Sequence, residues 1–325
     1  MVNMLKRNLD FQLMGIVAAL LLAGCATDTT TAATGAVSVA HAKLLQPWTE
    51  LTGARPGSLS GTPVQGSYIQ LRYPSAVSAR INDVYLVDAG LRRIFRYDTT
   101  QQTLAQFTTV TPDTKTSIYA APDLTVYVAN PSAGQVLRFT RDGTALPTLS
   151  APGDMARPIY VTMEEGGGRV LVADGLYDQI IVFNSLGRPL SVIKPQQLRA
   201  IGAIAAGPDG IYVVDRLDRK VVVIGWDGTF LYSFSLSDLS EPVAIAVNRD
   251  NIVFVGDKFE RTVKVYRMAK TQDGAAPTAA DADGIAPGSF GDISGLAVDG
   301  RKLYVTDGPN ARVKIMLINP DAGQK

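Results

Sequence analysis

The two residue types that carry much metal and nucleophilic chemistry occur once each in this chain of 325 residues, as Cys25 and His41. A single thiol cannot form an internal disulfide or supply the several ligands of a cysteine zinc site. A single imidazole cannot form a site built from two or three histidines, and it leaves a serine triad only one possible base. Any chemistry must therefore depend mainly on carboxylates, cations and their spacing.

Six short polar side chains recur directly after apolar runs, at Asp88, Asn130, Asp174, Asp215, Asp257 and Asp307. Such a set could form a ring of metal ligands. Asp and Asn also accept backbone N–H groups of a following loop, as in Asx turns. Because each of the six precedes a short loop, we predict this structural role for them.

Charged residues also stand just ahead of six runs of small and apolar residues. They are Arg72, Lys115, Arg157, Arg199, Glu241 and Asp292. If the runs surround one axis, these four cations and two acids could converge there on a polar ligand. Exposed loops are polar for simpler reasons as well. We take the six as candidate ligand-binding residues and assign no catalytic residue.

A calcium site is the alternative use of these acids. Calcium takes about six to eight oxygen ligands. Glu241 and Asp292 could contribute, with Asn248 and Asp299 farther along the same runs. This set is incomplete, so the sequence predicts no metal ligands and no cofactor, and calcium stays an open possibility.

The N-terminal residues form a targeting pattern. Lys6 and Arg7 precede an apolar run of eleven residues, 13–23, which is too short to span a bilayer and suits a secretory signal. The residues 22–25 (LAGC) then resemble a bacterial lipobox, whose cysteine is acylated. We therefore predict a signal peptide over 1–24 and a lipidated Cys25, in an outer membrane lipoprotein facing the periplasm or the cell surface.

Residues 25–37 contain the cysteine and a Thr/Ala-rich stretch that reads as a flexible tether. The formal net charge of the whole chain is +1, with 19% charged residues. This balance gives no field to attract nucleic acid, and no basic stripe is visible. Partners are therefore expected to be the membrane through the lipid, and an envelope protein or glycan.

Internal repetition predicts the fold. The six polar positions are 42, 44, 41, 42 and 50 residues apart, and the runs around them are short and rich in Val, Ile and Tyr. Repeats of about 40–45 residues with several strands each are typical of propeller blades. One repeat divides into strands over 202–207, 211–215, 220–226 and 229–234. The sequence thus predicts an all-β, six-bladed β-propeller of four-stranded antiparallel blades.

Closure of the ring needs a further strand. The last repeat supplies three strands, over 294–298, 302–307 and 312–318, and an open edge is a liability. We expect an N-terminal strand over 66–73 (GSYIQLRY) to pair with this last blade. The domains are then an N-terminal extension over 38–65 and a monomeric propeller over 66–320. The Ala/Asp-rich residues 271–284 are read as a surface loop.

The repeated phrase of aromatic-Val-x-Asp, a short loop, Arg-Val/Ile and alternating apolar residues resembles the NHL repeat family of six-bladed propellers. Asp88 with Arg93 and Asp307 with Arg312 match best, whereas Asn130 departs at the acid. The arginine position departs in four repeats, at Gln135, Gln179, Lys220 and Thr262. The resemblance implies the fold over 66–318 and says little about function, since one fold hosts many chemistries.

Three functions remain open. The first is a non-enzymatic, lipid-anchored binding or scaffold module for envelope proteins or glycans. The second is a calcium-dependent hydrolase or lactonase in the channel, as the resemblance to gluconolactonase-like propellers implies. The third is recognition of an anionic glycan or peptide by Arg72, Lys115, Arg157 and Arg199.

Overall fold

The computed structural model describes residues 44–60, 64–166, 168–269, 278–282 and 289–319. All of them belong to one compact unit, His41–Lys325. Cys25, His41, the signal peptide and the tether lie outside the described residues. Within the described part of the chain, no helix has the length and apolar character needed to cross a membrane.

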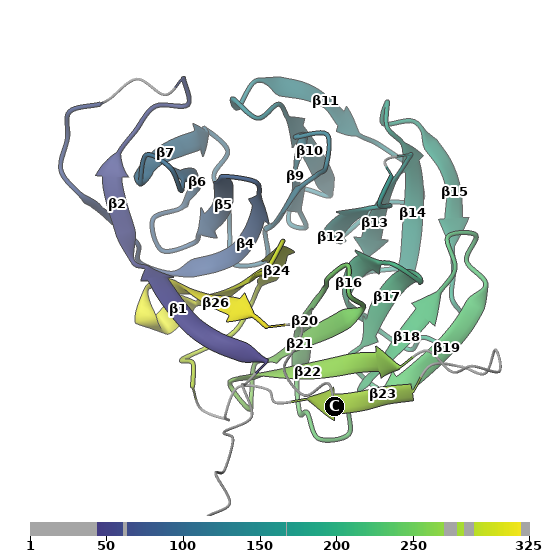
Figure 1. Cartoon of the computed structure of the whole chain (residues 1–325). Coiled ribbons are helices and arrows are strands. Elements are labelled where there is room, and N and C mark those ends of the chain that lie inside the picture. The colour runs from purple at the N-terminus through teal and green to yellow at the C-terminus, as the bar shows by residue number, and fades with distance from the viewer. Residues whose placement is uncertain (1–43, 61–63, 167, 270–277, 283–288, 320–325) are drawn as a thin grey trace, which may run out of the picture. The chain divides into compact units, whose positions relative to one another are not determined.

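Six antiparallel sheets surround a central channel, and each is one blade of a β-propeller (Figure 1). Blades 1–3 contain, from the inner strand outward, β4 (Pro74–Arg80), β5 (Asp83–Asp88), β6 (Arg93–Asp98) and β7 (Thr103–Thr108); β8 (Ser117–Ala120), β9 (Val126–Asn130), β10 (Gln135–Phe139) and β11 (Ala145–Leu149); β12 (Pro158–Met163), β13 (Arg169–Asp174), β14 (Gln179–Asn184) and β15 (Pro189–Ile193).

Blades 4–6 continue this order. They contain β16 (Ile201–Gly207), β17 (Gly210–Asp215), β18 (Lys220–Ile224) and β19 (Phe230–Ser235); β20 (Pro242–Val247), β21 (Ile252–Asp257), β22 (Thr262–Ala269) and β23 (Thr278–Ala282); β24 (Leu296–Asp299), β25 (Lys302–Asp307), a 3₁₀ turn η1 (Gly308–Asn310) and β26 (Arg312–Ile318). The predicted all-β, six-bladed fold is confirmed.

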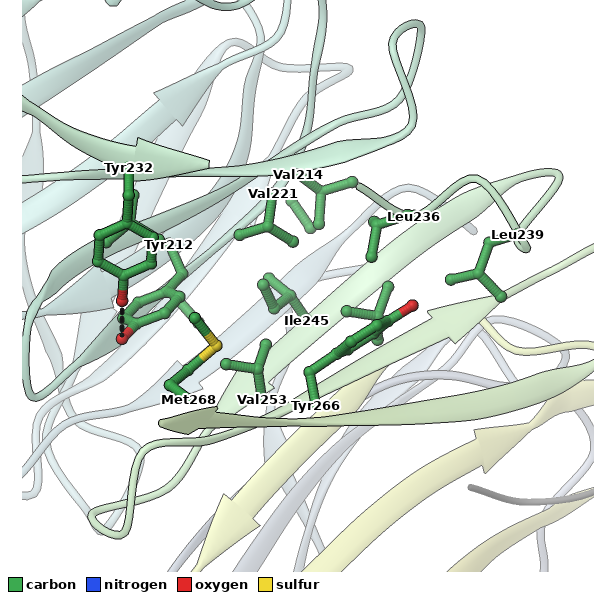
Figure 2. Close-up of a cluster of buried hydrophobic side chains, with 14 residues drawn as sticks. Tyr212, Val214, Val221, Tyr232, Leu236, Leu239, Ile245, Val253, Tyr266 and Met268 are labelled. Carbon is green, nitrogen blue, oxygen red and sulfur yellow. Dashed lines mark hydrogen bonds between the residues drawn. The ribbon is translucent and has the colours of Figure 1, made fainter. Parts of the chain in front are cut away.

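The second and third strands of a blade read as continuous apolar runs because neighbouring blades cover both faces of each sheet. In blade 4, every residue of β17 is buried, whereas the outer strand β19 is largely exposed. The buried side chains gather between consecutive blades. Figure 2 shows the cluster between blades 4 and 5, where Val214, Val221, Ile245 and Val253 pack together.

The strand that closes the ring is β1 (Leu45–Leu51), which pairs antiparallel with β26 and is the outer strand of blade 6. Figure 1 shows these two ends of the described chain side by side. The prediction that an N-terminal strand closes the last blade is confirmed. The prediction that 66–73 supplies it is wrong, because only Ile69 and Gln70 form a strand there, β3, and they pair with β2 (Gly53–Pro56).

Strand β2 pairs in parallel with β7, the outer strand of blade 1. The N-terminal segment therefore runs along the outside of blade 6 and then of blade 1, so it joins the two blades between which the ring closes. A second expectation also needs correction. Residues 278–282 of the Ala/Asp-rich stretch form β23, which pairs with β22 as the outer strand of blade 5.

Candidate functional site

Buried carboxylates fix the loops at one end of the channel, which we call the aspartate side. Asp215 is fully buried and accepts backbone N–H bonds from Arg199 at 2.7 Å, Ala200 at 3.3 Å, Leu217 at 3.1 Å and Asp218 at 3.2 Å. One carboxylate therefore holds both the loop before the inner strand and the loop after the second strand. Asp88, Asp174 and Asp257 act in the same way, which confirms their predicted turn role. Asp307 accepts the backbone N–H of Gly291 before the inner strand, but after the second strand it accepts side-chain bonds from Asn310 and Arg312.

In blade 2 two residues, Asn130 and Asp113, together hold the loops that a single carboxylate holds in blade 4. Asn130 accepts one backbone N–H, from Ala133 at 3.2 Å. Asp113 takes over the loop before β8, because it accepts the N–H of Lys115 at 2.8 Å and the hydroxyl of Ser132 at 2.5 Å. Burial alone would raise the pKa of the Asp113 carboxyl, but hydrogen bonds from Ser132, Lys115 and Thr116 outweigh it and lower the pKa.

The channel is a cavity of about 1000 Å³ lined by the inner strands of all six blades. Of the six candidate ligand-binding residues, two line it. Lys115 and Arg157 stand at its aspartate-side mouth, where the inner strands β8 and β12 begin. Both side chains are exposed, and the Arg157 guanidinium donates to the Gly175 carbonyl.

The other four candidates lie on the same side but outside the lining of the channel. Arg199 pairs with Asp218 at 3.2 Å. Asp292 accepts the Tyr73 hydroxyl at 2.9 Å, and burial together with Asp292 raises the pKa of that phenol. Arg72 and Glu241 are exposed, and their backbone N–H groups bond to buried aspartates. The six residues therefore share a face and do not converge on one point.

Arg216 completes the aspartate-side mouth and was missed by sequence reasoning. It follows the buried Asp215 directly, on the loop after the second strand, whereas the six predicted candidates all precede inner strands. Within the described part of the chain, none of Lys115, Arg157 and Arg216 forms an ion pair. Three cations from three consecutive blades thus give this mouth one sign of charge.

The opposite mouth has both signs of charge. Its lining includes Arg80, Glu165, Arg249, Asp250, Asp299 and Arg301. Arg249 pairs with Glu165 at 2.6 Å, and both side chains are exposed. Burial raises the pKa of the Asp299 carboxyl, and the nearby cations Arg80, Lys302 and Arg249 oppose this shift only in part.

The four oxygen donors considered for calcium are divided between the two ends. Glu241 and Asp292 lie on the aspartate side, whereas Asn248 and Asp299 line the opposite end. The Asn248 amide is also committed to its own turn, because its oxygen accepts the N–H groups of Asp250 and Ile252. Among the residues that the structure describes, no three His, Cys, Asp or Glu side chains form a group that could hold a metal ion.

Exposed apolar side chains form a second feature of the aspartate side, the apolar crescent, which consists of Leu176, Tyr177, Leu217 and Phe259. Their exposed fractions are 54%, 49%, 59% and 70%. They follow the buried aspartates of blades 3, 4 and 5 by two or three residues. Gly90, Ser132 and Pro309 stand two residues after the recurring polar residue in blades 1, 2 and 6. The crescent is therefore confined to three adjacent blades.

No protein-family profile matches the chain, and no curated protein matches it. Many solved structures share its fold. An inactive virginiamycin B lyase from Staphylococcus aureus with quinupristin is 15% identical, with a TM-score of 0.57, and the match covers 85% of this chain and 99% of the lyase. A gluconolactonase from Xanthomonas campestris is 15% identical, with a TM-score of 0.58 and coverage of 77% and 87%.

A protein of unknown function from Bacteroides thetaiotaomicron is 13% identical, with a TM-score of 0.60, and the match covers 83% of this chain and 77% of that protein. At such identities the likeness concerns the fold alone. The comparisons therefore support the β-propeller fold.

Proposed function

We propose that this chain is a non-enzymatic binding module of the bacterial cell envelope, an NHL-type propeller held by a lipid on Cys25, and that it docks a partner protein on its aspartate side. The observation that carries the proposal is the apolar crescent. Large apolar side chains with about half or more of their surface exposed, gathered on one face, are typical of protein interaction sites.

The turns themselves do not need these side chains. In blade 4 the backbone N–H groups of Leu217 and Asp218 bond to Asp215, so the loop is held by its main chain. A polar residue at position 217 would leave these two backbone bonds in place. Leu217 and Phe259 thus expose apolar surface without a folding role, which favours a binding role.

A protein suits this surface better than a glycan. Leu176, Leu217 and Phe259 offer apolar contacts and no hydrogen bonds, whereas sugars need polar partners. The exposed cations beside the crescent, Arg157 and Arg216, would complement an acidic residue of the partner. The partner is therefore expected to present apolar side chains flanked by acidic ones.

The test is cross-linking in the native envelope with a photoreactive residue at position 217 or 259. The matched control is position 186, because Leu186 is also an exposed leucine (72%) but lies in a turn at the opposite end of blade 3. We expect one defined product from 217 and 259 and none from 186. The partner identified in this product, once purified, should also bind the variant Leu217→Ser with Phe259→Ser at least tenfold more weakly than the unchanged protein.

Equal products from all three positions, or none from any, would contradict the proposal. The anchor is tested separately. Cys25→Ser should abolish incorporation of labelled palmitate and release the protein from the membrane fraction. Retention of the label after this substitution would disprove the lipid on Cys25.

A calcium-dependent hydrolase or lactonase is the second candidate, supported by the presence of a gluconolactonase and a lyase among chains with this fold. The division of its oxygen donors between the two ends of the channel argues against it. A thermal melt with up to millimolar calcium should leave the midpoint unchanged. A clear rise that a chelator reverses and that Glu241→Gln with Asp292→Asn removes would favour the enzyme.

A further inference from the structure

The channel is a second site beside the crescent, and the two share Arg157 and Arg216 at the aspartate-side mouth. Its volume of about 1000 Å³ lies at the upper end of the range for small-molecule pockets, about 300–1000 Å³. A folded partner cannot enter it. Any occupant must match the surface of the wall, which has three distinct parts along its length.

The middle of the wall is largely apolar. Half-buried aliphatic side chains of three inner strands contribute to it, namely Ile159, Val243, Val247, Leu296 and Val298. Some hydroxyl groups of the wall are engaged between neighbouring blades, whereas the buried Ser75 hydroxyl has no hydrogen-bond partner within the described residues. Ser78 accepts the N–H of Ala120 at 2.9 Å, and Thr162 accepts that of Ala206 at 3.1 Å. The wall therefore offers contact surface more than hydrogen bonds.

Tyr160 adds apolar surface to the part of the channel wall that blade 4 forms. It belongs to β12 of blade 3, and its hydroxyl donates to the carbonyl of Val243, in β20 of blade 5, at 2.8 Å. The side chain must therefore pass the inner edge of β16, which lies between these strands. Burial raises the pKa of Tyr160 to about 12, so the phenol stays neutral near pH 7.

The two ends of the wall differ in charge. Lys115, Arg157 and Arg216 line the aspartate-side mouth, and within the described residues no acid lines this end. At the opposite mouth, acids balance the cations, and Glu165 and Arg249 pair directly. A charged group with an apolar body would thus enter in one orientation, with a negative group at the aspartate side.

We propose that the channel binds an amphipathic anion. Its carboxylate or phosphate lies at the aspartate-side mouth against Lys115, Arg157 and Arg216, and its single apolar body extends along Val243, Leu296 and Val298. Charge-assisted hydrogen bonds to the cations fix the head group, and burial of the apolar body supplies most of the affinity.

The test is calorimetric titration of the full chain carrying Cys25→Ser, with each probe below its micelle concentration. Dodecanoate and dodecyl phosphate should bind one to one, at least tenfold more tightly than dodecanol, dodecyltrimethylammonium or inorganic phosphate. A preference between the two anions shows whether the head group is a carboxylate or a phosphate. If dodecanol binds as tightly as the two anions, the channel is only an apolar cavity. If inorganic phosphate binds as tightly as dodecyl phosphate, the channel is only an anion site. Either result overturns the proposal.

Three variants locate the ligand: one double variant at each mouth and one substitution inside the channel. Lys115→Gln with Arg157→Gln should weaken dodecyl phosphate at least tenfold, whereas the matched pair Arg249→Gln with Arg301→Gln at the opposite mouth should change it less than twofold. Val243→Trp should block the channel, since Val243 is half-buried and belongs to none of the core clusters of the described residues.

If Val243→Trp fails to fold, the comparison of the two glutamine pairs still decides. Equal losses from both pairs would place the ligand elsewhere and overturn the proposal. Leu217→Ser with Phe259→Ser should leave dodecyl phosphate affinity unchanged, so failure of channel binding and failure of partner docking can be told apart.

Discussion

At the aspartate side of blade 4, the Asp215 carboxylate is fully buried and accepts four backbone N–H bonds. At the opposite end of the channel, Glu165 and Arg249 meet with 52% and 78% of their side chains exposed. The first arrangement fixes loops, because one buried carboxylate bonds to the backbone of two of them. The second arrangement, the exposed ion pair, lies on a turn that the backbone forms without it. The difference shows which charges hold the fold and which are free to change.

Loss of a buried carboxylate should therefore have the largest effect. Asp215→Ala removes a buried carboxylate that accepts four backbone N–H bonds, and we expect a loss of about 2–4 kcal/mol of unfolding free energy in urea denaturation. The matched change Asp250→Ala, in an exposed turn at the opposite end, should cost less than about 0.5 kcal/mol. Equal losses would remove the distinction between the two ends.

The substitute carboxylate of blade 2 should have an intermediate effect that depends on pH. Asp113 has a lowered pKa in the folded protein, so its contribution is present above its ordinary pKa of 3.8 and is lost as the pH falls through the folded value. Asp113→Asn should cost about 1 kcal/mol at pH 7 and less as the pH falls below 4. Urea midpoints measured between pH 7 and pH 3 test this, and a constant difference would contradict it.

The exposed pair should have the smallest effect. Glu165→Gln removes the ion pair with Arg249, and exposed pairs contribute about 0–1 kcal/mol. We expect a change of less than about 0.5 kcal/mol at low salt and none at 1 M salt, from urea denaturation. A loss above about 1.5 kcal/mol would mean that the opposite mouth also holds the fold.

The spacing of the polar residues predicted the ring, since each blade repeats the same apolar runs. The strands predicted for blade 4 and the three predicted for blade 6 agree with the observed bounds to within about two residues. The closing strand was missed for a physical reason. In β1, Leu45 and Leu51 are buried and the five residues between them are exposed. The strand therefore lacks apolar alternation, and it contains Pro47, which an outer strand tolerates. Residues 66–73 have more β character, but only Ile69 and Gln70 of them pair, with β2.

The site was predicted in part. Lys115 and Arg157 were found because they precede inner strands, whereas Arg216 was missed because it follows a second strand. Antiparallel pairing brings these two kinds of loop to the same end of a blade, as Ile201 opposite Asp215 shows. The position after each buried aspartate could have revealed Arg216. The crescent could not be found in this way, since exposure depends on how the loops are held.

The pairing of β1 with β26 has a consequence for the order of folding. Leu45 lies opposite Ile318, so residues separated by most of the chain must meet before the ring is closed. Contacts between such distant residues are slow to form because a long loop must first be closed. During synthesis, β1 emerges among the first residues and must wait for the last blade, with its apolar positions Leu45 and Leu51 uncovered. A chaperone that binds β1 during this time would therefore speed folding more than a chaperone that binds a strand of blades 1–5.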